Sequence, residues 1–173
     1  AHLQFMEELV LSVGLGLALL IFAMVVLGFS GLYSTGQAWG LVGTLSLPGL
    51  LGWRIIATRK NIVNPLRELM ASPWTLKIFL ALMALYGLGY LIASLSPTLE
   101  GDSIAGYLVT ARQYAEQGGI VSVPTAYTDA QPANGQMLST LGFLLRDQIT
   151  AQLLVVWMPG LVGIAAIYVF GRK

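Results

Sequence analysis

The sequence predicts an all-α integral membrane protein with about four transmembrane helices, each of the roughly 20 apolar residues that a bilayer crossing needs. Apolar residues make up 56% of the chain and charged residues only 10%, which lies far outside the composition of soluble domains. The apolar residues gather in long uncharged stretches, and the basic residues gather in short segments between them. Membrane helices joined by basic loops have this pattern.

Three regions are long and apolar enough to cross a bilayer. Residues 9–53 contain no Asp, Glu, Lys or Arg, and this is about twice the length that one span needs. The turn-forming stretch SGLYSTGQ at residues 30–37 therefore divides the region into two helices. Residues 78–99 form the third predicted span, and residues 148–171 form the fourth.

Helix-start signals and prolines refine these predictions. Ser72 is placed to cap a helix that has Pro73 at its first position. The stretch NPLREL at residues 64–69 predicts a short cytoplasmic helix in the same way. Pro48 and Pro159 fall inside spans, where we expect them to kink the helices.

Basic residues predict the orientation, because Lys and Arg in short loops stay on the cytoplasmic side. Between the second and third spans, Glu68 is outnumbered by five basic residues: Arg54, Arg59, Lys60, Arg67 and Lys77. Residues 97–147, called the outer segment below, are instead rich in acids. We therefore expect the outer segment on the non-cytoplasmic side and both termini in the cytoplasm.

The chain is expected to fold as three successive parts. An N-terminal helical hairpin (1–57) is followed by a cytoplasmic basic loop with a short helix (58–73). The last part (74–173) consists of a span at 74–96, the outer segment at 97–147 and a final span at 148–171.

Several chemistries are excluded by what the sequence lacks. There is no cysteine, and the one histidine, His2, cannot build a zinc site or a Ser-His pair by itself. We therefore expect no metal site and no bound cofactor. The net charge of +1 gives no argument for nucleic-acid binding. Because the spans carry almost no ionisable residues, a transporter or channel is also disfavoured.

The outer segment predicts two short helices that lie in the membrane interface. From residue 103 to 117 apolar side chains recur with a period close to that of a helix, and Arg112 and Glu116 fall on the opposite face. Asp102 precedes this helix at the N-cap position, and two glycines follow it where a left-handed cap favours glycine. A second, apolar helix is predicted at residues 136–145.

This order of elements resembles part of a known family. The matching stretches are Asp102 with Ser103, YLVTARQYAEQGGI, PANGQMLSTLGFLL and the final IYVFGRK. Over residues 96–173 they resemble membrane-embedded C-type glycosyltransferases of the protein-mannosyltransferase and aminoarabinose-transferase branch. The resemblance implies a bacterial plasma-membrane protein that takes a sugar from a polyprenyl-phosphate donor on the outer membrane face.

The resemblance also implies roles for single residues. Asp102 would be the general base that takes a proton from the acceptor hydroxyl. Glu100, Arg112 and Arg146 would bind substrate, with the basic groups near the donor phosphate. Simpler interpretations stand beside these roles: Asp102 as an N-cap alone, and Arg112 with Glu116 as an exposed pair.

Two departures from the family keep a second hypothesis open. Ser103 stands where family members carry a second acid, and four spans do not close a cavity for donor and acceptor. We therefore expect either the N-terminal part of a longer enzyme or an inactive relative. The alternative is a non-catalytic membrane subunit that packs its Gly-rich helices into a larger membrane complex and docks through the outer segment.

Overall fold

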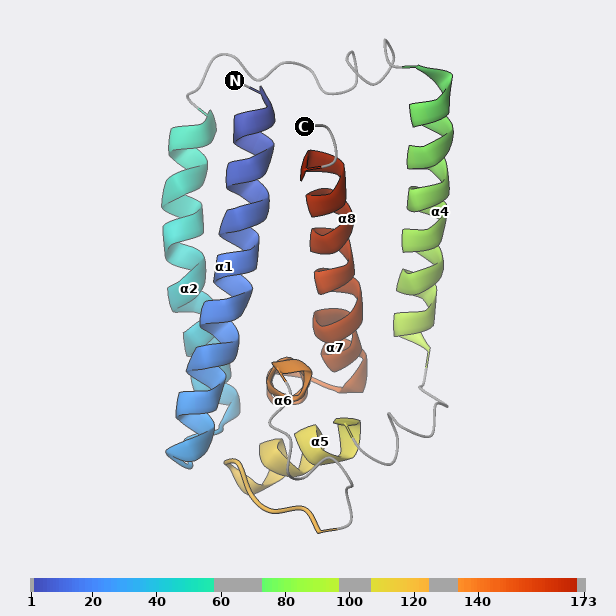
Figure 1. Cartoon of the computed structure of the whole chain (residues 1–173). Helices are drawn as coiled ribbons and strands as arrows, with labels where there is room; N and C mark the ends of the chain where they lie inside the picture. Colours follow the sequence, from blue (N-terminus) through green and yellow to red (C-terminus); the bar gives the residue numbers. More distant parts are fainter. Residues whose placement is uncertain (1, 58–72, 97–106, 125–133, 171–173) are drawn as a thin grey trace.

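The computed structural model describes residues 2–57, 73–96, 107–124 and 134–170 (Figure 1). Every regular element in these ranges is a helix. The elements in chain order are α1 His2–Phe29, α2 Thr35–Ala57, α4 Trp74–Leu95, α5 Leu108–Gln117, α6 Asn134–Leu145, α7 Gln148–Gln152, the π-helical segment η2 Leu153–Trp157 and α8 Met158–Phe170. The last three follow one another without a break and form one long helix.

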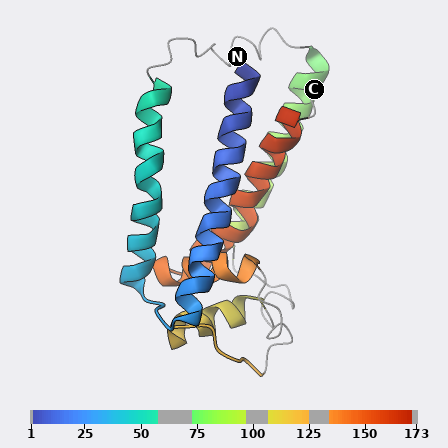
Figure 2. The ribbon, with the colours of Figure 1, turned by 60° about the vertical axis from the view of Figure 1, so that its left-hand side comes forward.

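The long helices α1, α2, α4 and α7–α8 run side by side, and the short helices α5 and α6 lie across one end of them (Figures 1 and 2). The start of α1 and the end of α8 lie at the opposite end of the molecule (Figure 1). The described helices of the outer segment are therefore gathered at one end of the long helices.

Three helical stretches are long and apolar enough to cross a membrane: Glu7–Phe29, Trp74–Leu95 and Gln148–Ile167. They make the chain an integral membrane protein in a lipid-bilayer environment. The predicted second span corresponds to α2, which forms as a helix but is not one of the three.

The turn between α1 and α2 is shorter than the sequence predicts. Helix α1 ends in a Schellman motif, in which Gly31 has a φ of 65° and the N–H of Leu32 donates to the Leu27 carbonyl at 2.9 Å. Ser34 then caps α2, because its Oγ accepts from the N–H of Gln37 at 3.3 Å. The last residues of the predicted turn therefore belong to α2.

The helix predicted to start at Pro73 starts one residue later, and Pro48 lies inside a helix as predicted. Pro73 has an extended ψ of 148° and stands before the first helical residue, so α4 begins at Trp74 and not at Pro73. Ser72, its predicted cap, and residues 64–69 lie outside the described residues. Pro48 lies inside α2, which continues to Ala57.

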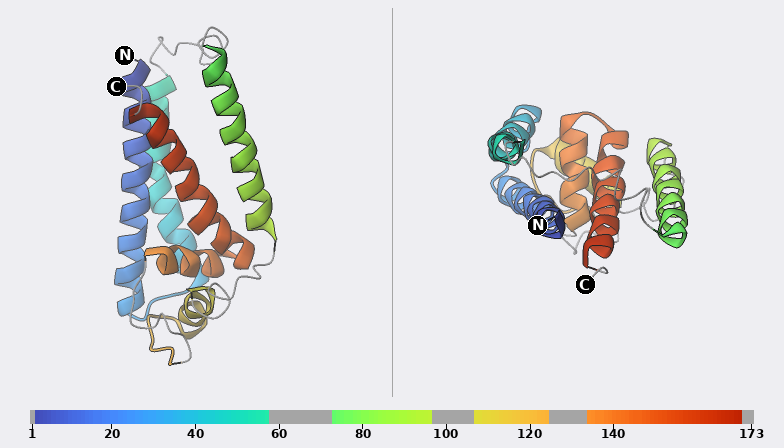
Figure 3. Two further views of the ribbon diagram at one scale, coloured as in Figure 1. Left: turned by 45° about the vertical axis from the view of Figure 1, so that its right-hand side comes forward. Right: turned by 90° about the horizontal axis from the view of Figure 1, so that it is seen from above.

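Pro159 directly follows the wide π turn of η2, where the N–H of Met158 donates to the Leu153 carbonyl. A wide turn accommodates the missing proline N–H within a membrane helix. The long helix packs against α4 in its η2 part and against α1 in its α8 part. Its inclined course is visible on the left of Figure 3.

The apolar core lies at the end where α5 and α6 cross the long helices. We call it the end cluster, and it consists of Met24, Tyr33, Ala38, Tyr114, Val123, Met137, Leu141 and Leu144. These residues come from α1, the α1–α2 turn, α2, α5, the segment after α5, and α6. The outer segment is therefore a structural part of the core.

Helix α6 forms where the sequence predicts the second short helix. The expected interfacial helix is the most enclosed element of the chain's described part, with eight of its 12 residues buried. Such burial leaves few side chains of α6 to face any surroundings other than the protein. Gly142 allows the closest approach, because a Cβ at this position would overlap the backbone of Ala151 in α7.

Candidate functional site

Helix α5 carries the described part of the family-like site. Its regular part begins at Leu108, and Tyr107 already has helical backbone angles. It ends as predicted, with Gly118 in the left-handed region at a φ of 78° and its N–H donated to the Tyr114 carbonyl. Asp102 and Glu100, the predicted base and a predicted substrate ligand, lie outside the described residues.

The end of α5 is joined to the turn between α1 and α2. The N–H of Tyr33 donates to the Gly118 carbonyl at 2.8 Å, and the N–H of Ile120 donates to the Gly28 carbonyl at 3.0 Å. A Cβ at Gly119 would lie 2.9 Å from the Gly28 carbonyl oxygen, which is too close for a side chain. Two segments far apart in the sequence are thus held at backbone contact.

Tyr33 completes this junction from inside the end cluster. Its hydroxyl donates to the Met24 carbonyl at 2.7 Å and lies 3.4 Å from Met137 Sδ. Burial, with a smaller contribution from Tyr114, raises the pKa of the Tyr33 hydroxyl far above its usual range. The neutral hydroxyl is therefore the form that the fold requires.

The two faces of α5 are as different as the sequence predicts, and the apolar face packs against α6. Thr110, Ala111 and Tyr114 are buried, and α5 packs extensively on α6. Arg112 and Glu116 are exposed. The apolar face of α5 is therefore covered by protein, and the position of α5 in the membrane interface stays a prediction.

Arg112 forms an ion pair within its own helix. Its Nε lies 2.8 Å from Glu116 Oε1, and the side chains are 68% and 58% exposed. Such exposed pairs contribute about 0.3–0.5 kcal/mol or less. The structure therefore has the simpler arrangement foreseen for these residues, and the guanidinium group remains accessible from outside.

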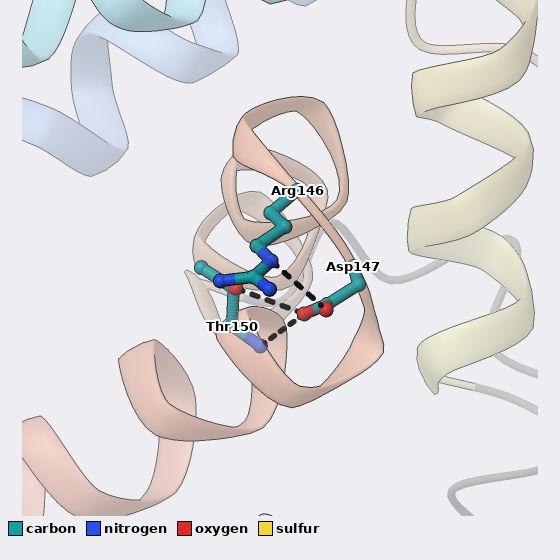
Figure 4. Close-up of polar contacts among 3 residues, drawn as sticks. All are labelled: Arg146, Asp147 and Thr150. Atoms are coloured by element: carbon teal, nitrogen blue, oxygen red, sulfur yellow. Dashed lines mark hydrogen bonds and ion pairs between the residues drawn. The ribbon is translucent and has the colours of Figure 1, made fainter.

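Arg146 also lies beside a carboxylate, at the start of the final long helix (Figure 4). Its Nε is 3.5 Å from Asp147 Oδ2. Asp147 Oδ1 accepts from both the backbone N–H and the hydroxyl of Thr150, each at 2.9 Å. These hydrogen bonds, first the backbone one and then the hydroxyl, hold the pKa of the Asp147 carboxyl below its usual value, and Arg146 adds to them.

Asp147 is thus the N-cap of α7, a role that the sequence analysis missed. The signal was present, because an Asp directly before an apolar helical run is a helix-start pattern. Asp147 therefore caps α7, and Arg146 pairs with the capping carboxylate. Neither interaction requires a substrate.

A second feature was not foreseen at all. A hollow of about 290 Å³ lies between α4 and the last long helix, lined by Tyr86, Gly87, Tyr90, Val156, Trp157, Gly160, Leu161 and Ile164. The Tyr86 and Tyr90 rings are 4.8 Å apart, centre to centre, at 49°. Glycines and aromatic residues at helical spacing inside one span were its only sequence signal.

Among the described residues, no group of three His, Cys, Asp or Glu side chains is placed to hold a metal ion. Neither a family model, nor a curated protein, nor a solved structure matches this chain.

Proposed function

We propose that the chain is the membrane module of a glycosyltransferase that uses a polyprenyl-phosphate sugar as donor. In this proposal α2 also crosses the membrane, as the second of four spans. The outer segment lies on the non-cytoplasmic side of a bacterial plasma membrane, and both termini are cytoplasmic. The observation that supports it is the packing of α5 and α6 onto one end of the apolar helices. A platform that is fixed at the end of membrane helices and carries charged side chains on its outer face is where a lipid-phosphate headgroup and an acceptor hydroxyl can meet.

Asp102 is the proposed general base. The chain that carries Glu100 and Asp102 joins α4, which ends at Leu95, to α5, which begins at Leu108. The base would take the proton of the acceptor hydroxyl as that oxygen forms a bond to the anomeric carbon of the sugar. The bond from this carbon to the phosphate oxygen breaks, and the polyprenyl phosphate leaves.

Arg112 and Arg146 are the proposed cations for the donor phosphate. Each lies beside a carboxylate in the free structure, at 2.8 Å and 3.5 Å respectively. Both pairs are largely exposed, so that exchanging the carboxylate for a phosphate costs little. Arginine matches a phosphate with two parallel hydrogen bonds.

The test is the replacement Asp102→Asn in the natural full-length protein, with transfer of a radiolabelled sugar from polyprenyl phosphate as the measurement. Loss of a general base lowers the rate by about 10²–10⁴-fold. The matched control is Asp129→Asn, which changes another acid of the same segment and should keep activity. Unchanged transfer by the Asp102→Asn protein would remove this residue from the catalytic role.

A second function is favoured by the exposure of α4. Only 6% of its apolar span is buried within the described chain, although helices of a complete bundle bury one face against neighbours. A non-catalytic subunit of a larger membrane complex would cover this surface with partner helices. The test is co-purification of the wild-type protein and of the Asp102→Asn variant. If the same partner chain accompanies both proteins and neither transfers sugar, the non-catalytic function is supported.

A further inference from the structure

The hollow between α4 and the last long helix is an apolar space within the membrane-spanning part of the molecule. Its volume is about 290 Å³, and no charged side chain lines it. Trp157 contributes ring carbons to the wall, because its Nε1 atom is buried away from accessible space. Both walls belong to helices that are long and apolar enough to cross a membrane. The hollow therefore offers an occupant a mostly apolar surface.

The hollow lies near the middle of both spans. At 1.5 Å per residue, Gly87 follows Trp74, the first residue of its span, by about 20 Å of helix. Gly160 follows Gln148, the first residue of the other span, by about 18 Å. The hydrocarbon core of a bilayer is about 30 Å thick. Lipid chains surround the protein at this depth, and lipid headgroups lie farther out.

One side of the hollow is open to these surroundings. Three of the lining residues, Tyr86, Tyr90 and Leu161, are 55%, 43% and 41% exposed. An apolar space of this kind does not hold water, since water needs polar partners. If it stayed empty, the side chains around it would lose their dispersion contacts on that side. The neighbouring hydrocarbon is therefore the material that fills it at the lowest cost.

The volume of the hollow excludes a partner helix as its occupant. One turn of an α-helix is 5.4 Å long and about 10 Å across, so that it takes up roughly 420 Å³. This is more than the hollow of about 290 Å³ can hold. A partner helix could lie over the opening without entering it. A hydrocarbon chain is thinner, and it can place part of its length in the hollow while the rest stays in the bilayer.

Two glycines, one in each wall, leave room for such a chain. A Cβ added at Gly87 or at Gly160 would meet no atom within 4 Å. Gly142, which serves a close helix contact, has the backbone of Ala151 at that place instead. Gly87 and Gly160 are thus not needed for close packing of α4 on the last long helix, and a larger side chain at either position would take up free space.

We propose that the hollow binds one acyl chain of a bilayer phospholipid. The described part of α4 packs on α7, η2 and α8, and only 6% of its span is buried. The bound chain adds contacts to this junction, so that lipid becomes part of the packing of α4. The headgroup stays outside the hollow and is not recognised by it. The site does not depend on the proposed sugar transfer.

The experiment uses the full chain in phosphatidylcholine nanodiscs that contain a phosphatidylcholine with a photoreactive diazirine at the middle of one acyl chain. Mass spectrometry locates the labelled residues after illumination. We expect labelling of Trp157 and Ile164, which line the hollow and are partly buried. Gly87→Leu and Gly160→Leu fill the hollow from opposite walls. Each should lower this labelling at least about fivefold, because a side chain and a lipid chain cannot share one volume.

Two matched controls test whether the effect belongs to the hollow. Gly89→Leu in α4 and Gly163→Leu in α8 also place a side chain where a Cβ meets no atom within 4 Å, but neither residue lines the hollow. Both variants should be labelled like the wild-type protein. Leu82 and Leu85 are 57% and 66% exposed and lie outside the hollow, so their labelling should be equal in every variant. Circular dichroism and elution volume verify that each variant is folded.

A second reagent tests the depth of the site. A diazirine beside the headgroup should label Trp157 and Ile164 at least about fivefold less than the mid-chain diazirine, since headgroups lie outside a core of about 30 Å. Equal labelling by the two reagents overturns the proposal. Equal labelling of the hollow in the filling and control variants overturns it as well. Labelling of Leu82 and Leu85 without Trp157 and Ile164 would show that the hollow excludes lipid, which is the third result that contradicts it.

Discussion

The two ends of the long helices bury their apolar residues in different ways. At one end, Met24, Tyr33 and Met137 belong to a cluster of buried residues from six segments of the chain. Away from this end, the side chains of α4 remain mostly exposed, including Leu82 at 57% and Leu85 at 66%. The residue types are alike, so hydrophobicity alone does not distinguish a protein core from a lipid-facing surface. Glycine contacts and buried hydrogen bonds make the distinction.

We expect the largest loss of stability when a glycine that touches a neighbouring helix is replaced by a larger residue. Gly142→Val forces α6 away from the Ala151 backbone, and we expect a loss of about 3 kcal/mol or more, as for severe overpacking. Gly163→Val, placed in a span where a Cβ meets nothing within 4 Å, should change stability by less than about 1 kcal/mol. Thermal unfolding in detergent measures both. Equal destabilisation would show that the two regions do not differ in packing.

Tyr33→Phe removes one buried hydrogen bond from the end cluster, and we expect a loss of about 1 kcal/mol. The effect also depends on pH. Because folding raises the pKa of this hydroxyl, the stabilisation is complete below the usual tyrosine pKa of about 10 and declines above it. Melting temperatures measured from pH 7 to pH 11 should therefore fall more steeply for the wild-type protein than for Tyr33→Phe. Parallel curves would contradict the requirement for a neutral Tyr33.

The cap at the start of the last long helix should have a smaller effect. Asp147→Ala loses both hydrogen bonds to Thr150 and should lower the melting temperature by about 2–4 °C. Asparagine also caps helices, so the Asp147→Asn variant should keep most of the stabilisation that the cap provides. Since folding lowers the pKa of Asp147, its contribution is present above the usual aspartate pKa of about 3.9 and is lost as the pH falls below it. The Asn variant should lack this acid dependence.

The smallest effect is expected at the exposed pair on α5. Arg112→Gln breaks the contact with Glu116 and should change the free energy of unfolding by less than about 0.5 kcal/mol. If Arg112 binds a donor phosphate, the same variant should raise the KM for the lipid-linked sugar without a loss of stability. A KM equal to that of the wild-type protein would leave Arg112 as a surface residue only.

Local signals in the sequence predicted the helices well. The uncharged stretches locate α1, α4 and the last long helix, and the glycine pair locates the end of α5 at Gly118. These signals are local, because run length and a left-handed cap depend on neighbouring residues alone.

Tertiary surroundings were not predictable in the same way. Helix α6 was expected at the membrane surface and is enclosed by protein, since an apolar sequence fits hydrocarbon and a protein core equally well. The hollow at Trp157 depends on the spacing between α4 and the last helix, which no local pattern fixes. For the candidate site, the sequence located the exposed pair at Arg112 and missed the cap at Asp147.

The hydrogen bond from Tyr33 to Gly118 has a consequence for biosynthesis. A ribosome adds about 5–20 residues per second, so that the 85 residues from position 33 to position 118 (118 − 33) take about 4–17 s to follow. During that time the first hairpin is already made, and Gly28 and Tyr33 lack the partners that later complete them. The N-terminal hairpin therefore waits in the membrane with an unfinished end, and the nascent chain acquires its core only after α6 emerges.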